Sequence, residues 1–253
     1  MDEQQQPSTS QNVSSFTTRM TNIFTSPSEL YTEVAASPVQ TTSWLIPMLT
    51  SIILGIVFTF VLYNNPSLRQ QIYDIQASGL QKAVEEGKMT QERADEMRDR
   101  MESSGSTMFM LFGAGGAIVS IAAMFFIGSL ALWLAAKIAL KFGGSWGKIL
   151  EMFGLTWLIG VLGTIITLIM VNLFTSMYAT PSGSLLVMNG FDIANKGHRL
   201  LSSLNIFTIW QTALVGIGLS KLSGKSAGIG MSVAFGLWLL WVVITVVTGF
   251  GRM

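Results

Sequence analysis

Five long apolar stretches constrain this chain more than any other feature of its sequence. They span residues 44–63, 109–134 with an extension toward 140, 150–174, 205–222 and 229–250, and carry almost no charge. A helix needs about 20 mostly apolar residues to cross the hydrocarbon core of a bilayer. Lipid offers no hydrogen bonds to the backbone, and these runs are continuous rather than alternating, so helices fit them and barrel strands do not. The sequence predicts an all-α, polytopic membrane protein with five transmembrane helices, the fourth of which is expected to be capped at its start by Asn205.

The composition agrees with a protein embedded in the lipid bilayer and narrows its function. Charged residues make up 11% of the chain and its mean hydropathy is +0.52, whereas soluble domains carry about 25% charged residues. A net charge of +1 provides no strongly basic surface, so we expect no nucleic-acid partner. The chain has no cysteine, which excludes disulfides and thiolate metal sites.

Motifs for catalysis are missing from the sequence. The single histidine, His198, cannot supply a metal site by itself. The sequence has no P-loop and no nucleophile-elbow motif. Glu151, beside Lys148, is expected in the headgroup layer at the mouth of the third apolar stretch. We therefore expect a protein that is not an enzyme and that binds neither a metal nor another cofactor.

Two polar regions precede the first apolar stretch. Residues 1–13 are rich in Gln and Ser and are predicted to form a disordered tail. Residues 14–43 predict two amphipathic interfacial helices, the second starting at Pro27 after Ser26. In the first of these helices, Arg19 is expected on the polar face, opposite the apolar residues Phe16, Met20, Ile23 and Phe24. These helices either lie in the membrane interface or pack on the protein's own loops.

Residues 64–107 form a long hydrophilic insertion with six basic and eight acidic residues. Apolar residues recur there at helical spacing, with a break at Gly87 and a helix cap at Thr90. This pattern predicts a helical hairpin between transmembrane helices 1 and 2, with its charges on a solvated face. Residues 44–253 are accordingly expected to be one five-helix membrane domain that carries this hairpin.

Small residues recur every four positions near the C-terminal end. The series consists of Gly216, Ser220, Gly224, Gly228, Ser232 and Gly236. Such spacing lets helix backbones approach closely in lipid. Because a turn follows Leu222, the series predicts a tight hairpin between the fourth and fifth spans, with the small residues on the facing surfaces.

Three polar side chains inside the apolar stretches are the best candidates for a transport path, namely Thr167, Asn172 and Gln211. They either form hydrogen bonds between helices, which is the commoner role of such residues, or line a hydrated path for a small solute.

Two sequence motifs resemble those of the Yip family, the Rab/Ypt-interacting integral membrane proteins and their prokaryotic relatives. The first runs from Phe24 through Pro27 to Tyr31 and is followed by Trp44-x-x-Pro47. The second is the block around Phe207, Trp210, Gly216 and Gly218. The resemblance implies five spans, a cytoplasmic N-terminus and a non-cytoplasmic C-terminus. The eukaryotic members bind small GTPases and carry an Asp-Leu-Tyr-Gly-Pro motif before their first span. This chain lacks that motif, which argues against a small GTPase as partner and favours the prokaryotic branch.

These patterns favour a membrane-organising or trafficking-type scaffold that works through helix packing and oligomerisation. Its expected partners are the lipid bilayer, further copies of the chain and other membrane proteins. Its expected location is a bacterial-type plasma (inner) membrane, as a multi-pass protein. The alternative is a small-solute channel or transporter component that uses the polar residues of the third and fourth spans.

Overall fold

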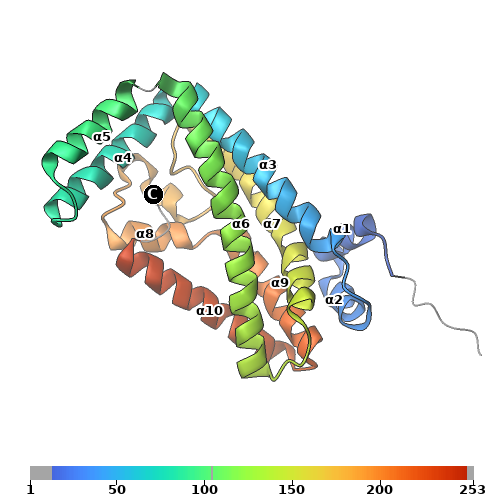
Figure 1. The fold of residues 1–253 in the computed structure, drawn as a ribbon. Helices are drawn as coiled ribbons and strands as arrows, with labels where there is room; N and C mark the ends of the chain where they lie inside the picture. The colour runs from blue at the N-terminus through green and yellow to red at the C-terminus, as the bar shows by residue number, and fades with distance from the viewer. Residues whose placement is uncertain (1–12, 104, 250–253) are drawn as a thin grey trace, which may run out of the picture.

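The computed structural model describes residues 13–103 and 105–249, and these residues fold into helices joined by short connections (Figure 1). The helices are α1 (Phe16–Thr25), α2 (Pro27–Ala36), α3 (Thr42–Asn64), α4 (Pro66–Glu85), α5 (Gln91–Ser103), α6 (Gly105–Leu140), α7 (Trp146–Phe174), the 3-10 helix η1 (Gly183–Gly190), α8 (Lys196–Ser203), α9 (Ile206–Ser223) and α10 (Ala227–Thr248). Almost all of the predicted disordered tail, residues 1–13, lies outside the described residues.

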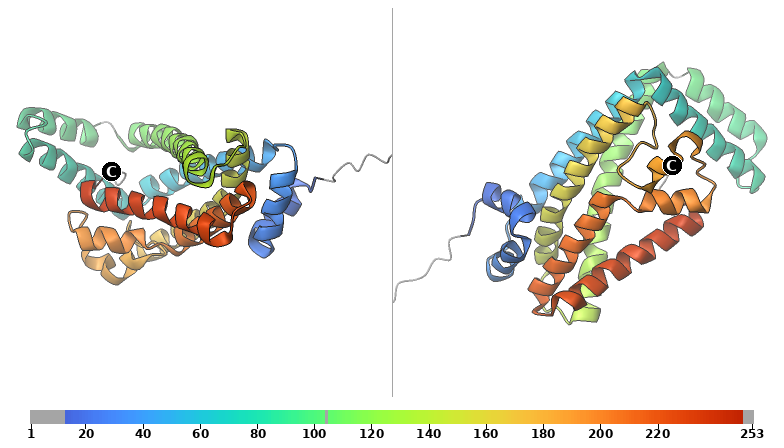
Figure 2. Two further views of the ribbon diagram at one scale, coloured as in Figure 1. Left: turned by 90° about the horizontal axis from the view of Figure 1, so that it is seen from below. Right: turned by 180° about the vertical axis from the view of Figure 1, so that it is seen from behind.

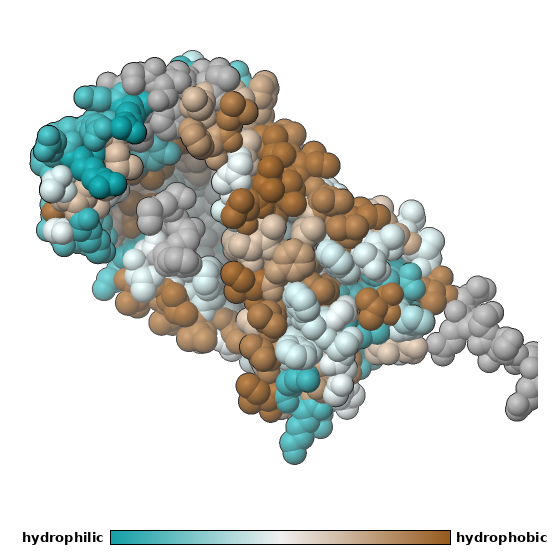
Figure 3. Space-filling model, viewed as in Figure 1, coloured by the Kyte–Doolittle hydropathy of each residue, from teal (hydrophilic) through white to brown (hydrophobic). Residues whose placement is uncertain are grey.

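Five of the helices are long and apolar enough to cross a membrane, which confirms the five predicted spans. They are α3, most of α6, α7, α9 and α10. Their exposed side chains are largely apolar: Ile138 is 81% exposed and Leu173 is 74% exposed. Apolar surface of this extent would be unfavourable in water, and Figure 3 shows it as brown patches along α6 and α10.

The helices α3, α6 and α7 run side by side, and α9 packs against both α7 and α10 (Figures 1 and 2). The N-terminal helices α1 and α2 lie at the same end of the molecule as the α6–α7 connection and the α9–α10 turn. The pair α4–α5 and residues 175–205 lie at the other end. The chain therefore separates its connections into two groups, one at each end of the spans.

Close contact between α3 and α7 depends on Gly154. A Cβ atom added there would lie 2.3 Å from the Cα of Trp44 and 2.9 Å from the carbonyl oxygen of Ser43. Pro47 lies four residues after Ser43 inside α3 and has no N–H to donate to that carbonyl. The first turn of α3 thus packs directly on the backbone of α7.

The helix α9 begins beside the second half of α7 rather than at its end. Phe207 packs on Gly163, where an added Cβ would lie 2.9 Å from the Cβ of Phe207. The eleven residues of α7 beyond Gly163 extend about 16 Å further at 1.5 Å per residue. Residues 175–205, with η1 and α8, occupy the region beyond the start of α9.

Several predicted helix boundaries are confirmed. Asn205 caps α9 by accepting hydrogen bonds from the backbone N–H groups of Phe207 and Thr208. Thr90 accepts a bond from the N–H of Arg93 at the start of α5. Ser26 is the residue before α2, as predicted, but its side chain makes no capping bond there. The turn between α4 and α5 contains Gly87 at a φ of 69°, a conformation that favours glycine.

Candidate functional site: a buried charge cluster under the N-terminal helices

Arg19 of α1 is buried, with only 1% of its side chain exposed, and all five of its guanidinium N–H groups have acceptors. Nη2 and Nε donate to Glu33 Oε1 of α2 at 2.8 and 3.2 Å, and Nη1 donates to Glu151 Oε1 of α7 at 2.5 Å. The hydroxyls of Ser37 and Ser43 accept at 3.2 and 3.1 Å. Because arginine has five donors, its hydrogen-bonding capacity is fully used.

Glu151 is completely buried and forms ion pairs with two basic side chains. Its Oε1 accepts from Arg19, and its Oε2 lies 3.0 Å from the Nζ of Lys148, one turn earlier on α7. Lys148 also donates to the backbone carbonyl of Val34 in α2. An ionised carboxylate without partners would be strongly disfavoured at such a position. The two cations therefore account for its burial and fix α2 against the start of α7.

Glu33 completes the cluster from its partly exposed side. Ser14 donates to it from its backbone N–H at 3.1 Å and from its hydroxyl at 2.8 Å. Burial raises the pKa of Glu33, but hydrogen bonds from Ser14 and Arg19 lower it by more, so the pKa lies below its ordinary value. Glu33 is therefore ionised at neutral pH, and the cluster brings two basic side chains, Arg19 and Lys148, against two acidic ones, Glu33 and Glu151.

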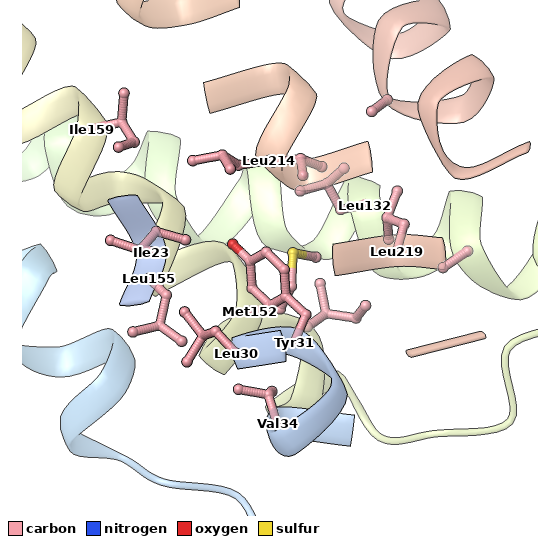
Figure 4. Packing of buried hydrophobic residues seen from close by; sticks show 14 of the residues in the cluster. Ile23, Leu30, Tyr31, Val34, Leu132, Met152, Leu155, Ile159, Leu214 and Leu219 are labelled. Carbon is pink, nitrogen blue, oxygen red and sulfur yellow. The ribbon is translucent and has the colours of Figure 1, made fainter. Parts of the chain in front are cut away.

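An apolar contact surrounds these charges and places α1 and α2 in the main core of the protein. Ile23, Leu30, Tyr31 and Val34 are each 0–1% exposed and belong to one cluster with residues of α6, α7, α9 and α10. Figure 4 shows Tyr31 pointing into this cluster beside Met152. The two N-terminal helices are thus packed on the ends of the spans.

The structure corrects the expected positions of two charged residues. Arg19 does not lie on the polar face of its helix, and Glu151, which was expected in the headgroup layer, is enclosed by protein. One signal was present in the sequence: Arg19 follows Phe16 by three residues and precedes Ile23 by four, which places it on the buried stripe. Its partner Glu151 is 132 residues away, and no local pattern indicates that pairing.

The small-residue series divides between contact and exposed positions. Gly216 and Ser220 lie at the α9–α10 contact: a Cβ added to Gly216 would lie 2.6 Å from the Sδ of Met231. Gly224 ends α9 at a φ of 63°. The other members, Gly228, Ser232 and Gly236, are exposed, and an added Cβ at either glycine would have nothing within 4 Å.

The small residue that α10 presents to α9 is instead Gly230, which is not a member of that series. A Cβ there would lie 2.3 Å from the carbonyl oxygen of Gly216. A period of four residues drifts around a helix that has 3.6 residues per turn, and the α9–α10 turn resets the phase. The facing surface therefore differs from the one that the series predicted.

Most of the residues that carried the family resemblance lie at contacts between helices. Pro27 is the first residue of α2. Trp44 and Pro47 are at the α3–α7 contact, where Trp44 also stacks on Phe125 of α6 with 6.2 Å between ring centroids. Phe207 packs on Gly163 of α7, and Trp210 meets Phe24 of α1 edge to face at 5.8 Å.

The three polar candidates of the spans are not brought together. Thr167 faces a cavity near residues 175–205. Asn172 is exposed and donates to the carbonyl of Leu168 in its own helix. Gln211 is half-buried on α9 beside Gly160 of α7. They do not line one continuous path through the described part of the chain.

Comparisons with known proteins agree with this architecture. The Yip1 domain model matches residues 21–249, a range that begins within α1 and extends past α10. Membrane protein YknW of Bacillus subtilis (strain 168) is 30% identical over 150 residues, which are 57% of this chain and 61% of that relative. The match thus covers about three fifths of the relative's length. No solved structure matches the chain significantly. With a match over almost its whole length, the chain belongs to the Yip1 domain family.

Proposed function

We propose that this Yip1-family membrane protein is a non-enzymatic scaffold whose helices α1 and α2 form a fixed platform for other membrane proteins. The observation that carries the proposal is the buried cluster of Arg19, Glu33, Lys148 and Glu151. Buried ion pairs contribute little net stability but can specify one arrangement of the elements that they join. Here they join two short helices to the ends of two spans, which suits a surface that must keep its shape.

The outer face of the platform carries apolar side chains. Met20 of α1 is 38% exposed, and Val39, between α2 and α3, is 40% exposed. Both side chains are only partly covered by protein, and Val39 also approaches Gly147 at the start of α7. Exposed apolar side chains next to a membrane favour contact with a neighbouring protein or with lipid.

Two further features fit the scaffold. The exposed small residues Gly228, Ser232 and Gly236 of α10 would allow close approach by another helix, including one from a second copy. The separation of Thr167, Asn172 and Gln211 gives less support to a transporter. We place the platform in the cytoplasm, at a bacterial-type plasma membrane, and the α4–α5 hairpin outside the bilayer on the opposite side.

The proposal is tested with surface substitutions rather than by deleting the platform, because deletion would also remove Ile23, Leu30 and Tyr31 from the core. We expect the Met20→Ser, Val39→Ser variant to lose crosslinked complexes several-fold in native membranes while its melting temperature is unchanged. The matched control is Leu185→Ser, Leu186→Ser, which alters two exposed apolar residues of η1 at the other end. The control should form complexes as the wild type does.

A separate experiment tests the alternative function, a small-solute channel or transporter component. Purified protein in liposomes should pass neither ions nor small solutes. Reproducible flux that disappears in a folded Gln211→Leu variant would replace the scaffold with a transporter. If the platform variant and the control formed crosslinked complexes equally well, α1 and α2 would not be the surface that contacts other membrane proteins.

A further inference from the structure

A cavity of about 660 Å³ lies between the spans and the residues 175–205. Binding sites for small molecules usually have volumes of about 300–1,000 Å³. Figure 3 shows the molecule hollowed between the hydrophilic α4–α5 pair and the apolar surface of α10. None of the residues of α1 or α2 lines the cavity, so it is separate from the charge cluster.

The cavity reaches the middle of the spans at one end and the loops at the other. Met124 lies near the centre of the apolar part of α6, and Trp238 lies near the centre of α10. Tyr178 and Ser184 line the opposite end and belong to the loop region after α7. The cavity extends this far because α9 starts beside Gly163. No part of α9 therefore packs against the last turns of α7.

The lining is mixed, but its hydroxyls are most numerous at the loop end. The spans contribute mainly apolar side chains together with three threonines, namely Leu62, Met124, Trp238, Trp241, Val242, Thr167, Thr208 and Thr245. The loop end contributes Tyr178, Thr180, Ser184, Ser202, Ser203 and Asn205 together with the apolar residues Met177, Phe191 and Ile193. No Lys, Arg, Asp or Glu is among the described residues that line the cavity. Such a gradient matches a molecule with an acyl chain and an uncharged polar head.

One wall residue supplies an acceptor without a partner. The Oε1 of Gln76 in α4 is buried and has no hydrogen-bond partner among the described residues, and Gln76 lines the cavity. A buried acceptor left unpaired is disfavoured. A hydroxyl on a bound molecule would satisfy it.

We propose that this cavity binds one lipid-class amphiphile with an uncharged, hydroxyl-bearing head, such as a diacylglycerol. An acyl chain lies against Met124 and Trp238, and the head lies against Gln76 and the serine and threonine hydroxyls near Ser184. An anionic phospholipid is a poorer occupant because no Lys or Arg is among the described residues that line the cavity to pair with its phosphate.

The test uses a diacylglycerol with a photoreactive diazirine in its acyl chain, added to the full chain in nanodiscs. We expect it to label peptides containing Met124 or Trp238, and to do so at least about tenfold more than a phosphatidylglycerol with the same chain, the factor that corresponds to about 1.4 kcal/mol. Thr167→Trp, which fills the cavity from α7, should abolish the labelling. Ile169→Trp, two residues away and 57% exposed, should leave it unchanged.

A second variant covers the case in which Thr167→Trp does not fold. Gln76→Leu keeps a similar side-chain volume but removes the acceptor, and it should lower the labelling by diacylglycerol several-fold without changing that by phosphatidylglycerol. Labelling that is equal in wild type, Thr167→Trp and Ile169→Trp would mean that the probe reports only surrounding lipid and would overturn the proposal. Stronger labelling by phosphatidylglycerol would overturn the uncharged head.

Discussion

Replacing Arg19 by alanine is expected to lower the free energy of unfolding by about 3–5 kcal/mol, because it leaves Glu151 buried with one of its two cations removed. The substitution also removes five hydrogen bonds that hold α1 to α2, α3 and α7. Reversible unfolding in mild detergent, followed by circular dichroism, measures the change. Few substitutions elsewhere in the chain should destabilise it as much.

Two further variants test whether burial, and not charge alone, determines how much the free energy of unfolding changes. Arg100→Ala removes an exposed arginine that pairs with Glu96 within α5, and it should leave the unfolding transition where it is. Arg19→Met combined with Glu151→Leu removes both fully buried charges and should recover most of the lost stability, because the carboxylate that remains, Glu33, is partly exposed and keeps its hydrogen bonds from Ser14. If Arg19→Ala behaved like Arg100→Ala, the cluster would not be buried in the membrane-embedded protein.

Replacing Gly230 by leucine is expected to destabilise the protein by about 1–3 kcal/mol or more, because a larger side chain forces the α9 and α10 backbones apart. The first added atom would already lie 2.3 Å from the carbonyl oxygen of Gly216 and 2.8 Å from the backbone nitrogen of Ser220. Backbone atoms cannot move aside as a flexible side chain can. Thermal unfolding of the detergent-solubilised protein gives the measurement.

The matched control for Gly230 is Gly228, two residues earlier on the same helix. Gly228→Leu adds the same side chain at an exposed position with nothing within 4 Å, so the stability of the single chain should not change. The periodicity of the sequence predicted the opposite, with Gly228 at the contact. Equal destabilisation by both variants would mean that α10 is rotated relative to the structure described above.

The features that the sequence predicted correctly are those that depend on lipid or on neighbouring residues. The five spans follow from the length of apolar sequence that a bilayer requires. The caps at Thr90 and Asn205 follow from a side chain that bonds to backbone groups two or three residues later. In both cases the physical cause lies within a few residues or in the solvent.

The features that the sequence did not predict depend on contacts between distant segments. Arg19 and Glu151 are separated by 132 residues, and nothing near either of them indicates the other. The contact surface of α10 depends on how the turn after Gly224 sets its rotation. The cavity depends on α9 starting beside Gly163, and this shift along α7 leaves no trace in hydropathy.

Helices α1 and α2 are held in place as part of the membrane domain by the charge cluster and the shared apolar core. Amide hydrogen exchange of residues 16–36 in nanodiscs tests it most directly, because exchange reports the free energy of local opening. We expect strong protection in the wild type and exchange about 100-fold faster or more in Arg19→Ala, with the protection of α7 retained. Exchange in the wild type as fast as in an unstructured peptide would contradict the account.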